Sequence, residues 1–438
     1  MVTRRTLLKS AAFGALAQST LARQAKALVS TDMSAAGPSA KEPHFFVYVQ
    51  MQGAWDPCLA FDPKDRSALL PNGERAFDQP YSIDEVRTFG SIPLAPQGFV
   101  LGKYADRMAV INGIEMEVDT GHTAGTIMSG VLMPRASGSP FVQAVVARRQ
   151  SYLKHCSMPH IYSARDGEFV AGPYNSTSVV AAPADIVTMV GLGGGQSDDD
   201  LAKLQLILQD FQQTLTTASE RRLFQSYVAA VPATINMRAQ LRAGKFVPPA
   251  ESTTAAGMGQ LFGQLFALGI VGSVTWQLGL GGTSNYNFDT HSDHFASHPL
   301  GKAMADVDTL ATELGKIPLD DHTSVWDRTT VVLSSEFSRT ARLNSSQGKD
   351  HNVHSNSLVL LGYKVRAGVY GASGTRVLGN GSAFEAHAGL PVDLATGQPS
   401  SQGELLKTKH LWAGFGAICG IDTSREFGTD AKPVGFFT

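Results

Sequence analysis

The chain has little cysteine and no segment long enough to cross a membrane. Its 438 residues include only Cys58, Cys156 and Cys419. This odd number, without metal-type spacing, argues against a disulfide framework or a cysteine zinc site. One disulfide outside the cytoplasm and a reactive thiol at Cys58 both stay open, but a buried structural cysteine is the favoured interpretation of each. No apolar run reaches the roughly 20 residues of a membrane helix.

Charge of one sign and several common motifs are also lacking. The formal net charge is -2, so neither nucleic acid nor an anionic membrane surface is expected as a partner. The chain has no G-x-S-x-G, which argues against a classical Ser-His-Asp hydrolase. It also has no G-x-x-x-x-G-K-[ST] loop and no G-x-G-x-x-G after a strand, so nucleotide binding is disfavoured.

The first residues carry an export pattern. Arg4 and Arg5 stand before a weakly apolar segment at 10–21, and Ala25-Lys26-Ala27 offers a small-x-small cleavage site. A chance arginine pair before a short helix is the alternative, but three parts in the correct order argue against it. We therefore expect a twin-arginine signal peptide, the twin-arginine translocase as a partner during export, and a periplasmic or secreted protein. This route carries folded proteins, often loaded with a cofactor, which favours a metal.

Strand and helix patterns alternate along the rest of the chain and predict an α/β fold. The expected organisation is a signal peptide at 1–27, a flexible leader at 28–43 and one domain at 44–438, with a helical insertion at about 198–246 that packs on the sheet as a peripheral layer. Buried strands are expected at 44–51, 107–114, 159–162, 270–278, 331–333 and 357–361, and helices at 255–268, 300–314 and 405–414.

Polar side chains follow several of these strands at the point where each strand ends. Asp56 follows the first strand and His122 the second, Asp289 and His291 follow the strand at 270–278, and Glu336 follows 331–333. In open α/β sheets, ligand sites lie outside the carboxyl ends of the strands. Residues far apart in the sequence are therefore expected to converge on one edge of the sheet.

The loop before the last strand adds Asp350, His351 and His354. Carboxylate oxygen and imidazole nitrogen are favoured ligands of divalent cations. An ordinary polar surface loop is the alternative for this stretch alone, but the convergence favours a metal site. Lys349 is expected to be exposed. The residues expected near one common point are Asp289, His291, Glu336 and His351, with Asp56 approaching from the neighbouring strand.

Four blocks of the sequence together resemble a known group. They are Gly53–Asp56, Phe288–His291, Ser335–Thr340 and Gly348–His351. They resemble the successive blocks of a large twin-arginine-exported bacterial family of unknown function, which is similar to the alkaline phosphatase and sulfatase superfamily. The resemblance covers roughly residues 45–378. It implies a three-layer α/β/α sandwich with a mostly parallel sheet, and one or two divalent metal ions (Zn, Ca or Mg).

The resemblance also implies roles for individual residues. The implied ligands are Asp56, Glu336 and Asp350 for one ion and Asp289, His291 and His351 for the other, with His354 in reserve. A Ser, Thr or Cys nucleophile is implied at the helix start after an early strand. This chain has no Ser beside His122, so only Thr120 or Thr123 could serve. Ser338 stands where Gly is more usual.

Two functions follow as expectations. The first is a metal-dependent hydrolase of phosphate or sulfate esters, whose substrate would be a small anionic ester. The second is a non-catalytic envelope protein of the same fold that retains at most a metal site. Intact metal ligands without a competent nucleophile would favour the second.

Overall fold

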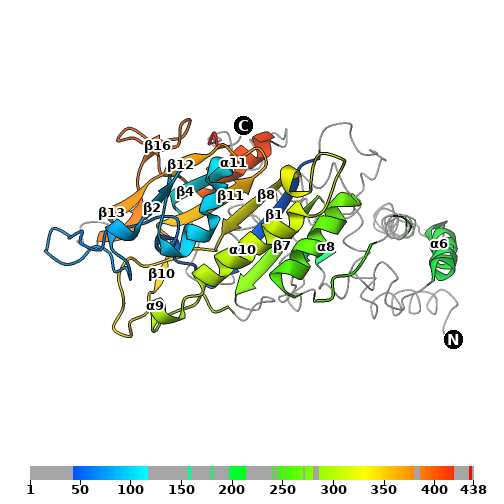
Figure 1. Ribbon diagram of the computed structural model, residues 1–438, viewed down its shortest axis with the longest axis horizontal. Coiled ribbons are helices and arrows are strands. Elements are labelled where there is room, and N and C mark those ends of the chain that lie inside the picture. Colours follow the sequence, from blue (N-terminus) through cyan, green and yellow to red (C-terminus); the bar gives the residue numbers. More distant parts are fainter. Residues whose placement is uncertain are drawn as a thin grey trace.

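The protein is described from a computed structural model (Figure 1). The signal peptide, nearly all of the leader, the strand at 159–162, Thr120, His122 and Thr123 lie outside the described residues. The described residues are 43–116, 156–158, 179–180, 197–213, 239, 243, 246–251, 253–269, 272–279, 286–378, 385–418 and 434–436.

An eight-stranded sheet forms the centre of the molecule, in the order β12-β4-β11-β8-β1-β7-β5-β6. Among the described strands of this sheet, only β11 runs antiparallel to its neighbours, so the expected mostly parallel sheet is confirmed. All predicted strands other than 159–162 are present. The strands are β1 (Phe45–Gln52), β4 (Met108–Ile114), β5 (Cys156–Met158), β6 (Val179–Val180), β7 (Ser273–Gly279), β8 (Thr329–Ser334), β11 (Asn356–Gly362) and β12 (Gly368–Gly371).

Strand β1 lies inside the sheet because both of its faces are apolar. Phe45 and Val47 point into one core, and Phe46 and Tyr48 point into the other. All eight residues of β1 are buried. A parallel strand covered on both faces needs such a nearly continuous apolar run rather than strict alternation. The sequence of β1 therefore suits an interior position, and the strand lies between β7 and β8.

Helices cover both faces of this sheet. On one face lie α8 (Ala255–Ala267), α10 (Leu300–Gly315) and the 3₁₀ segment η3 (Pro96–Arg107), and their apolar residues share a core with Val47 (Figure 1). On the other face lies α11 (Thr408–Ile418), whose Phe415 ring packs 6.3 Å from that of Phe46. The predicted helices 255–268, 300–314 and 405–414 are thereby confirmed, the last with shifted ends.

Short helices and two-stranded sheets lie outside the eight-stranded sheet. The stretch after β1 contains small strands and 3₁₀ turns, and α9 precedes α10. These elements are η1 (Pro57–Leu59), η2 (Ile83–Glu85), β2 (Arg87–Phe89), β3 (Ile92–Leu94), α9 (His294–Ser297), η6 (Trp326–Arg328), β9 (Ser338–Arg339), β10 (His351–Asn352), β13 (Ser373–Val377), β14 (Glu385–Gly389), β15 (Val392–Asp393) and β16 (Gln398–Pro399).

The predicted helical block at 198–246 is described mainly through α6 (Asp198–Gln213). Figure 1 shows α6 away from the sheet, and Leu206 and Ile207 are exposed on it. Most of the remaining block lies outside the described residues. Within the part of the chain that the structure describes, no helix has the length and apolar character needed to span a membrane.

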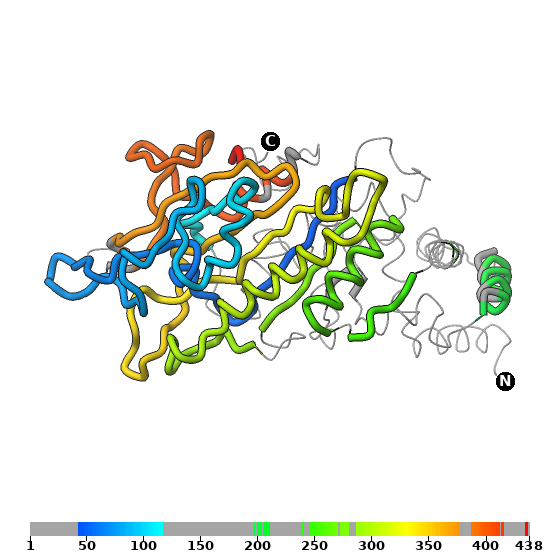
Figure 2. The backbone as a smooth tube through the Cα atoms, in the orientation of Figure 1, coloured from blue at the N-terminus to red at the C-terminus, as the bar shows by residue number. Residues whose placement is uncertain are grey.

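The direction of the strands decides where the loops meet. Strands β1, β7 and β8 are parallel and end at the same edge of the sheet, and β11 begins there because it runs the other way. Figure 2 shows the segment between β8 and β11 beside α9 at this end, and Asp293 N–H donates to the Ser346 carbonyl across the contact. We call this end the strand-end edge.

We expect His44 to make the protein less stable in acid. Burial, with a smaller effect of Lys364, lowers the pKa of His44 from 6.5 to about 3. The unfolded chain then binds one more proton between these values, so the contribution is complete above pH 6.5 and is lost as the pH falls toward 3. His44→Gln should remove up to about 1.4 kcal/mol per pH unit from the slope of unfolding free energy in this window.

Urea unfolding at several pH values measures this slope. Glutamine can keep a hydrogen bond to Thr330, whose Oγ1 lies 2.8 Å from His44 Nε2. His322→Gln, in an exposed loop, is the matched control for the loss of a histidine. Equal slopes for wild type and His44→Gln would contradict the prediction.

Candidate metal centre

Three donor atoms from two loops face one another at the strand-end edge. His291 Nε2 lies 3.0 Å from Asp289 Oδ1 and 3.1 Å from His351 Nε2, and the third side of the triangle, from His351 Nε2 to Asp289 Oδ1, is 3.5 Å. Ligands of a tetrahedral zinc ion at about 2.0–2.1 Å are separated by about 3.3 Å. The three atoms therefore have the mutual spacing of a metal site, and this group could hold an ion.

The group is open to solvent on one side. The side chain of His291 is 46% exposed and that of His351 is 20% exposed. Structural zinc sites have four protein ligands, whereas catalytic sites have three and keep one position open. Three protein donors beside solvent match the second pattern.

Asp350 orients one of these ligands from behind. Its Oδ1 lies 3.0 Å from His291 Nδ1 and accepts a hydrogen bond from Asn344 Nδ2. Partial burial acts to raise the pKa of Asp350, but the hydrogen bonds from His291 and Asn344 outweigh it and lower the pKa. A carboxylate on the far nitrogen of a histidine fixes the tautomer that a metal requires. Asp350 thus supports His291 rather than joining the donor triangle.

Arg339 holds the loops of the centre together. Its guanidinium is buried, and it donates to the carbonyl oxygens of Ala54, Phe288 and Lys349 and to Asp289 Oδ1 at 2.6 Å. These partners come from the segments that follow β1, β7 and β8. A charged donor with several acceptors is stronger and more directional than a neutral one. The position of the Asp289 carboxylate is therefore set by Arg339.

Glu336 binds the backbone at the end of β1. Gly53 and Ala54 both have positive φ values, 117° and 64°, which turn their successive N–H groups to one side. Both N–H groups donate to Glu336 Oε1, at 2.8 and 3.2 Å, and the Ser335 hydroxyl donates to Oε2. Such paired N–H groups form an anion-binding nest. Glu336 fills this nest, and both of its oxygens have protein donors.

Asp56 is likewise committed to protein partners. Its Oδ2 accepts a hydrogen bond from Lys349 Nζ at 2.7 Å and lies 2.9 Å from His294 Nε2, and its Oδ1 accepts from the Cys58 N–H. Burial acts to raise the pKa of Asp56, but Lys349 and His294 overcome it and hold the pKa well below its ordinary value. The expectation that Lys349 is exposed was wrong, because its side chain is fully buried.

The remaining predicted residues lie elsewhere. His354 Nδ1 lies 2.8 Å from Glu115 Oε1, and Arg376 donates to the other oxygen of Glu115, so His354 belongs to a separate polar group. Among the described residues, the structure thus brings Asp289, His291 and His351 together, with Asp350 behind them. It places Asp56 and Glu336 in neighbouring networks of their own.

A comparison with protein families identifies the group to which the chain is similar. The family described as "Protein of unknown function (DUF1501)" matches residues 46–376, which is more than half of the chain. The chain belongs to this family. The matched segment contains all four blocks from which the sequence resemblance was drawn, so the expected family of unknown function is confirmed. A search of curated proteins found no match.

The sequence analysis missed two residues near the candidate metal centre. Lys349 was expected at the surface, and His294 was not expected to contact Asp56. The ring of His294 is fixed between Asp56 and Thr290, whose Oγ1 lies 2.6 Å from His294 Nδ1. Burial lowers the pKa of His294 despite the hydrogen bond to Asp56. The sequence offers no local signal for this contact, because His294 and Asp56 are 238 positions apart.

A second group in the DUF1501 chain, Cys58 with Asp62 and His387, could also hold an ion. All three are buried, and Cys58 is a free thiol whose pKa is raised well above its usual value, chiefly by burial. Asp62, however, already forms an ion pair with Lys64 at 2.7 Å. The group is therefore charge-compensated without an ion, and the favoured interpretation of Cys58 as a structural residue is retained.

Gly348 allows the two ligand loops to approach, and replacing it should disturb the centre. A Cβ atom at this position would lie 1.9 Å from the carbonyl carbon and oxygen of His291. Gly348→Ala must therefore displace the backbone that carries His291. We expect a loss of about 1–3 kcal/mol in unfolding free energy, together with weaker binding of any divalent ion that the candidate centre holds.

Denaturant unfolding and zinc titration measure the two effects. Gly301→Ala in α10 is the matched control, because its new methyl group would meet no atom closer than 3.7 Å and alanine favours a helix. The control should be neutral or stabilising. If both variants behave alike, the close approach at Gly348 is unimportant.

Proposed function

We propose that the protein is an exported metal-dependent hydrolase of phosphate or sulfate esters. The single observation that carries the proposal is the donor triangle of Asp289, His291 and His351, with Asp350 behind His291. The arrangement has three ligands, an orienting carboxylate and an open side, as catalytic metal sites do.

Zinc is the ion that the donor set fits best among Zn, Ca and Mg. Calcium and magnesium prefer oxygen ligands only, whereas two imidazole nitrogens and one carboxylate are a common zinc set. When bound, the ion would act as a Lewis acid on an ester oxygen and favour attack on the phosphorus or sulfur.

The protein's own residues have defined roles in this proposal. Asp289, His291 and His351 bind the ion, Arg339 fixes the carboxylate of Asp289, and Asp350 keeps the proton on His291 Nδ1. The half-exposed face of His291 admits a small anionic ester from solvent. Thr120 and Thr123, proposed as nucleophiles beside His122, lie outside the described residues.

The architecture supports the proposal at the level of the fold. A mostly parallel sheet with helices on both faces, and a site at the carboxyl ends of its strands, is the arrangement expected of an alkaline phosphatase-like three-layer sandwich. We propose this fold kinship for the chain, with the function argued from the site because fold alone does not imply function.

One observation favours a second candidate, a non-catalytic envelope protein that keeps a metal site. Asp56 and Glu336, which the resemblance assigns to a second ion, have protein donors on both carboxylate oxygens. A centre of reduced metal capacity would suit a structural or binding role. The two candidates differ in whether the loaded protein turns over a substrate.

The metal test uses thermal unfolding. A chelator should lower the melting temperature of the purified mature protein and added zinc should restore it, because a ligand that binds only the folded state stabilises it. Asp289→Asn and His351→Gln should lose this response. His354→Gln, whose partner is Glu115, is the control and should keep it. A melting temperature indifferent to zinc in the wild type would refute the metal site.

The hydrolase test follows on the same preparations. Zinc-loaded wild type should hydrolyse an aryl phosphate or an aryl sulfate, and Asp289→Asn should reduce the rate at least about 100-fold, since a metal ligand supplies several kcal/mol of transition-state stabilisation. Metal-dependent stability without hydrolysis of any ester in a broad phosphate and sulfate panel would favour the non-catalytic candidate.

Export is tested at the amino terminus. Replacing Arg4 and Arg5 with Lys should leave full-length precursor in the cytoplasm, because the arginine pair is the recognition element of the twin-arginine route. Fractionation and immunoblotting measure the distribution. The prediction is wrong if the replaced protein still reaches the periplasm in mature form through the twin-arginine route.

A further inference from the structure

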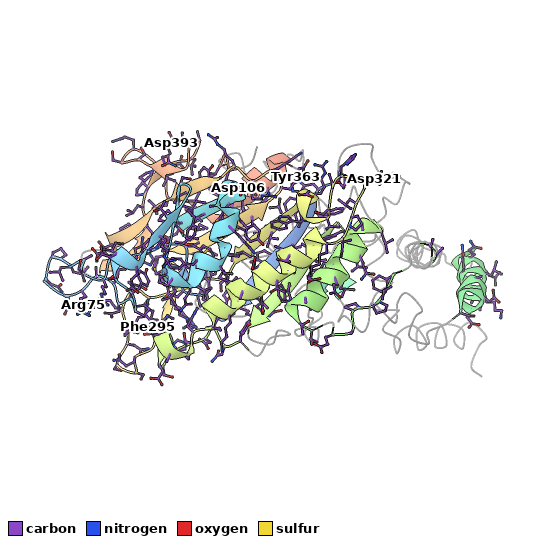
Figure 3. The ribbon with its side chains drawn as sticks, in the orientation of Figure 1. Arg75, Asp106, Phe295, Asp321, Tyr363 and Asp393 are labelled. Carbon is purple, nitrogen blue, oxygen red and sulfur yellow. The ribbon has the colours of Figure 1, made fainter. Side chains whose placement is uncertain are left out.

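Lys349 is a buried cation paired with the carboxylate of Asp56. Its side chain is fully buried, its Nζ lies 2.7 Å from Asp56 Oδ2, and the ring of Phe295 lies 5.4 Å from the same nitrogen. Phe295 marks this end of the molecule in Figure 3. Lysine is almost never fully buried unless it is paired, because removing its charge from water is costly. The pair with Asp56 is therefore a built feature of the strand-end edge.

Two backbone hydrogen bonds hold Lys349 in the loop between β9 and β10. Its N–H donates to the carbonyl of Thr290, and its carbonyl accepts from Arg339. Both backbone groups are thus fixed to the loops after β7 and β8. The following residues, Asp350 and His351, reach the donor triangle from the same short segment. One loop therefore supplies a protein cation to Asp56 and a metal ligand to the triangle.

The formal charges of the residues at the strand-end edge show how much positive charge would neutralise them. The network contains four carboxylates and two protein cations, so its formal charge is -2. One divalent ion compensates this formal charge completely, and a second would leave an excess of two positive charges. The carboxylates are Asp56, Asp289, Glu336 and Asp350, and the cations are Arg339 and Lys349.

We propose that Lys349 is a built-in cation that occupies Asp56 and limits the centre to one divalent ion, held by Asp289, His291 and His351. The inference rests on the proposed metal site and adds its ion count and the role of Lys349. Asp56 is then a positioning residue for the loop and does not bind the ion. The ammonium is fully buried against Asp56, so it acts through charge and does not contact a substrate.

The experiment compares the number of zinc ions bound per chain in the mature protein and its variants, by elemental analysis after dialysis. A competition titration measures the zinc affinity of each protein. Asp289→Asn should lose one ion per chain relative to wild type. The paired variant Asp56→Asn/Lys349→Met removes both charges together, so no buried charge is left alone, and it should lose none. Its zinc affinity should change by less than about tenfold, which is the smallest effect expected on losing a residue that orients a metal ligand.

Each outcome has a distinct meaning. Loss of an ion in Asp56→Asn/Lys349→Met, while Asp289→Asn also loses one, would overturn the inference and leave the metal centre standing. No zinc in the wild type would overturn the metal centre, and the inference with it. Asp56→Asn alone is an internal check: if it folds, its ion count should equal that of wild type, and its melting temperature should be below that of the paired variant because Lys349 is unpaired. Lys103→Met/Asp308→Asn, a partly exposed pair, controls for removing an ion pair as such.

Discussion

The buried guanidinium of Arg339 is the interaction on which the strand-end edge depends. It sits where three loops from distant parts of the sequence meet, and each loop presents backbone carbonyls that have left their strands. Such carbonyls would be costly if buried without donors. A guanidinium supplies five donors in a rigid plane, which a lysine or a neutral amide cannot match. Asp289 compensates its charge and is held in place by the same bond.

Much of the fold could be predicted because its signals are local. The strand at β1 is a nearly continuous apolar run, and α10 buries Met304, Val307 and Leu310 at helical spacing. In open α/β sheets, ligand sites lie outside the carboxyl ends of the strands. The gathering of Asp289, His291 and His351 could therefore be expected from the sequence without knowledge of any tertiary contact. Alternation and periodicity describe the chain over about ten residues, which is the length of these elements.

The finer pairing of charges could not be predicted, because it depends on contacts between distant residues. Asp56 and Lys349 are 293 positions apart, and Glu336 meets Gly53 across 283. A carboxylate at a strand end has the same local sequence whether it binds a metal, a lysine or a backbone nest. Only burial and the direction of each side chain separate these roles. Lys349 shows this most clearly, since its neighbours Gly348 and Asp350 are typical of a surface turn.

The reversed direction of β11 has a consequence for how this edge can change. Because β8 ends and β11 begins at the same edge, the segment between them is anchored twice beside the candidate metal centre and never crosses the sheet. Insertions in its outer part, near Ser345, would alter the rim of the site, including the contacts of Asn344 with Asp350 and of Ser346 with Asp293, while both anchors stay within the core. Changes in the length of this loop can thus alter which molecules reach the candidate centre. They leave the sheet and its covering helices, which keep the protein folded, unchanged.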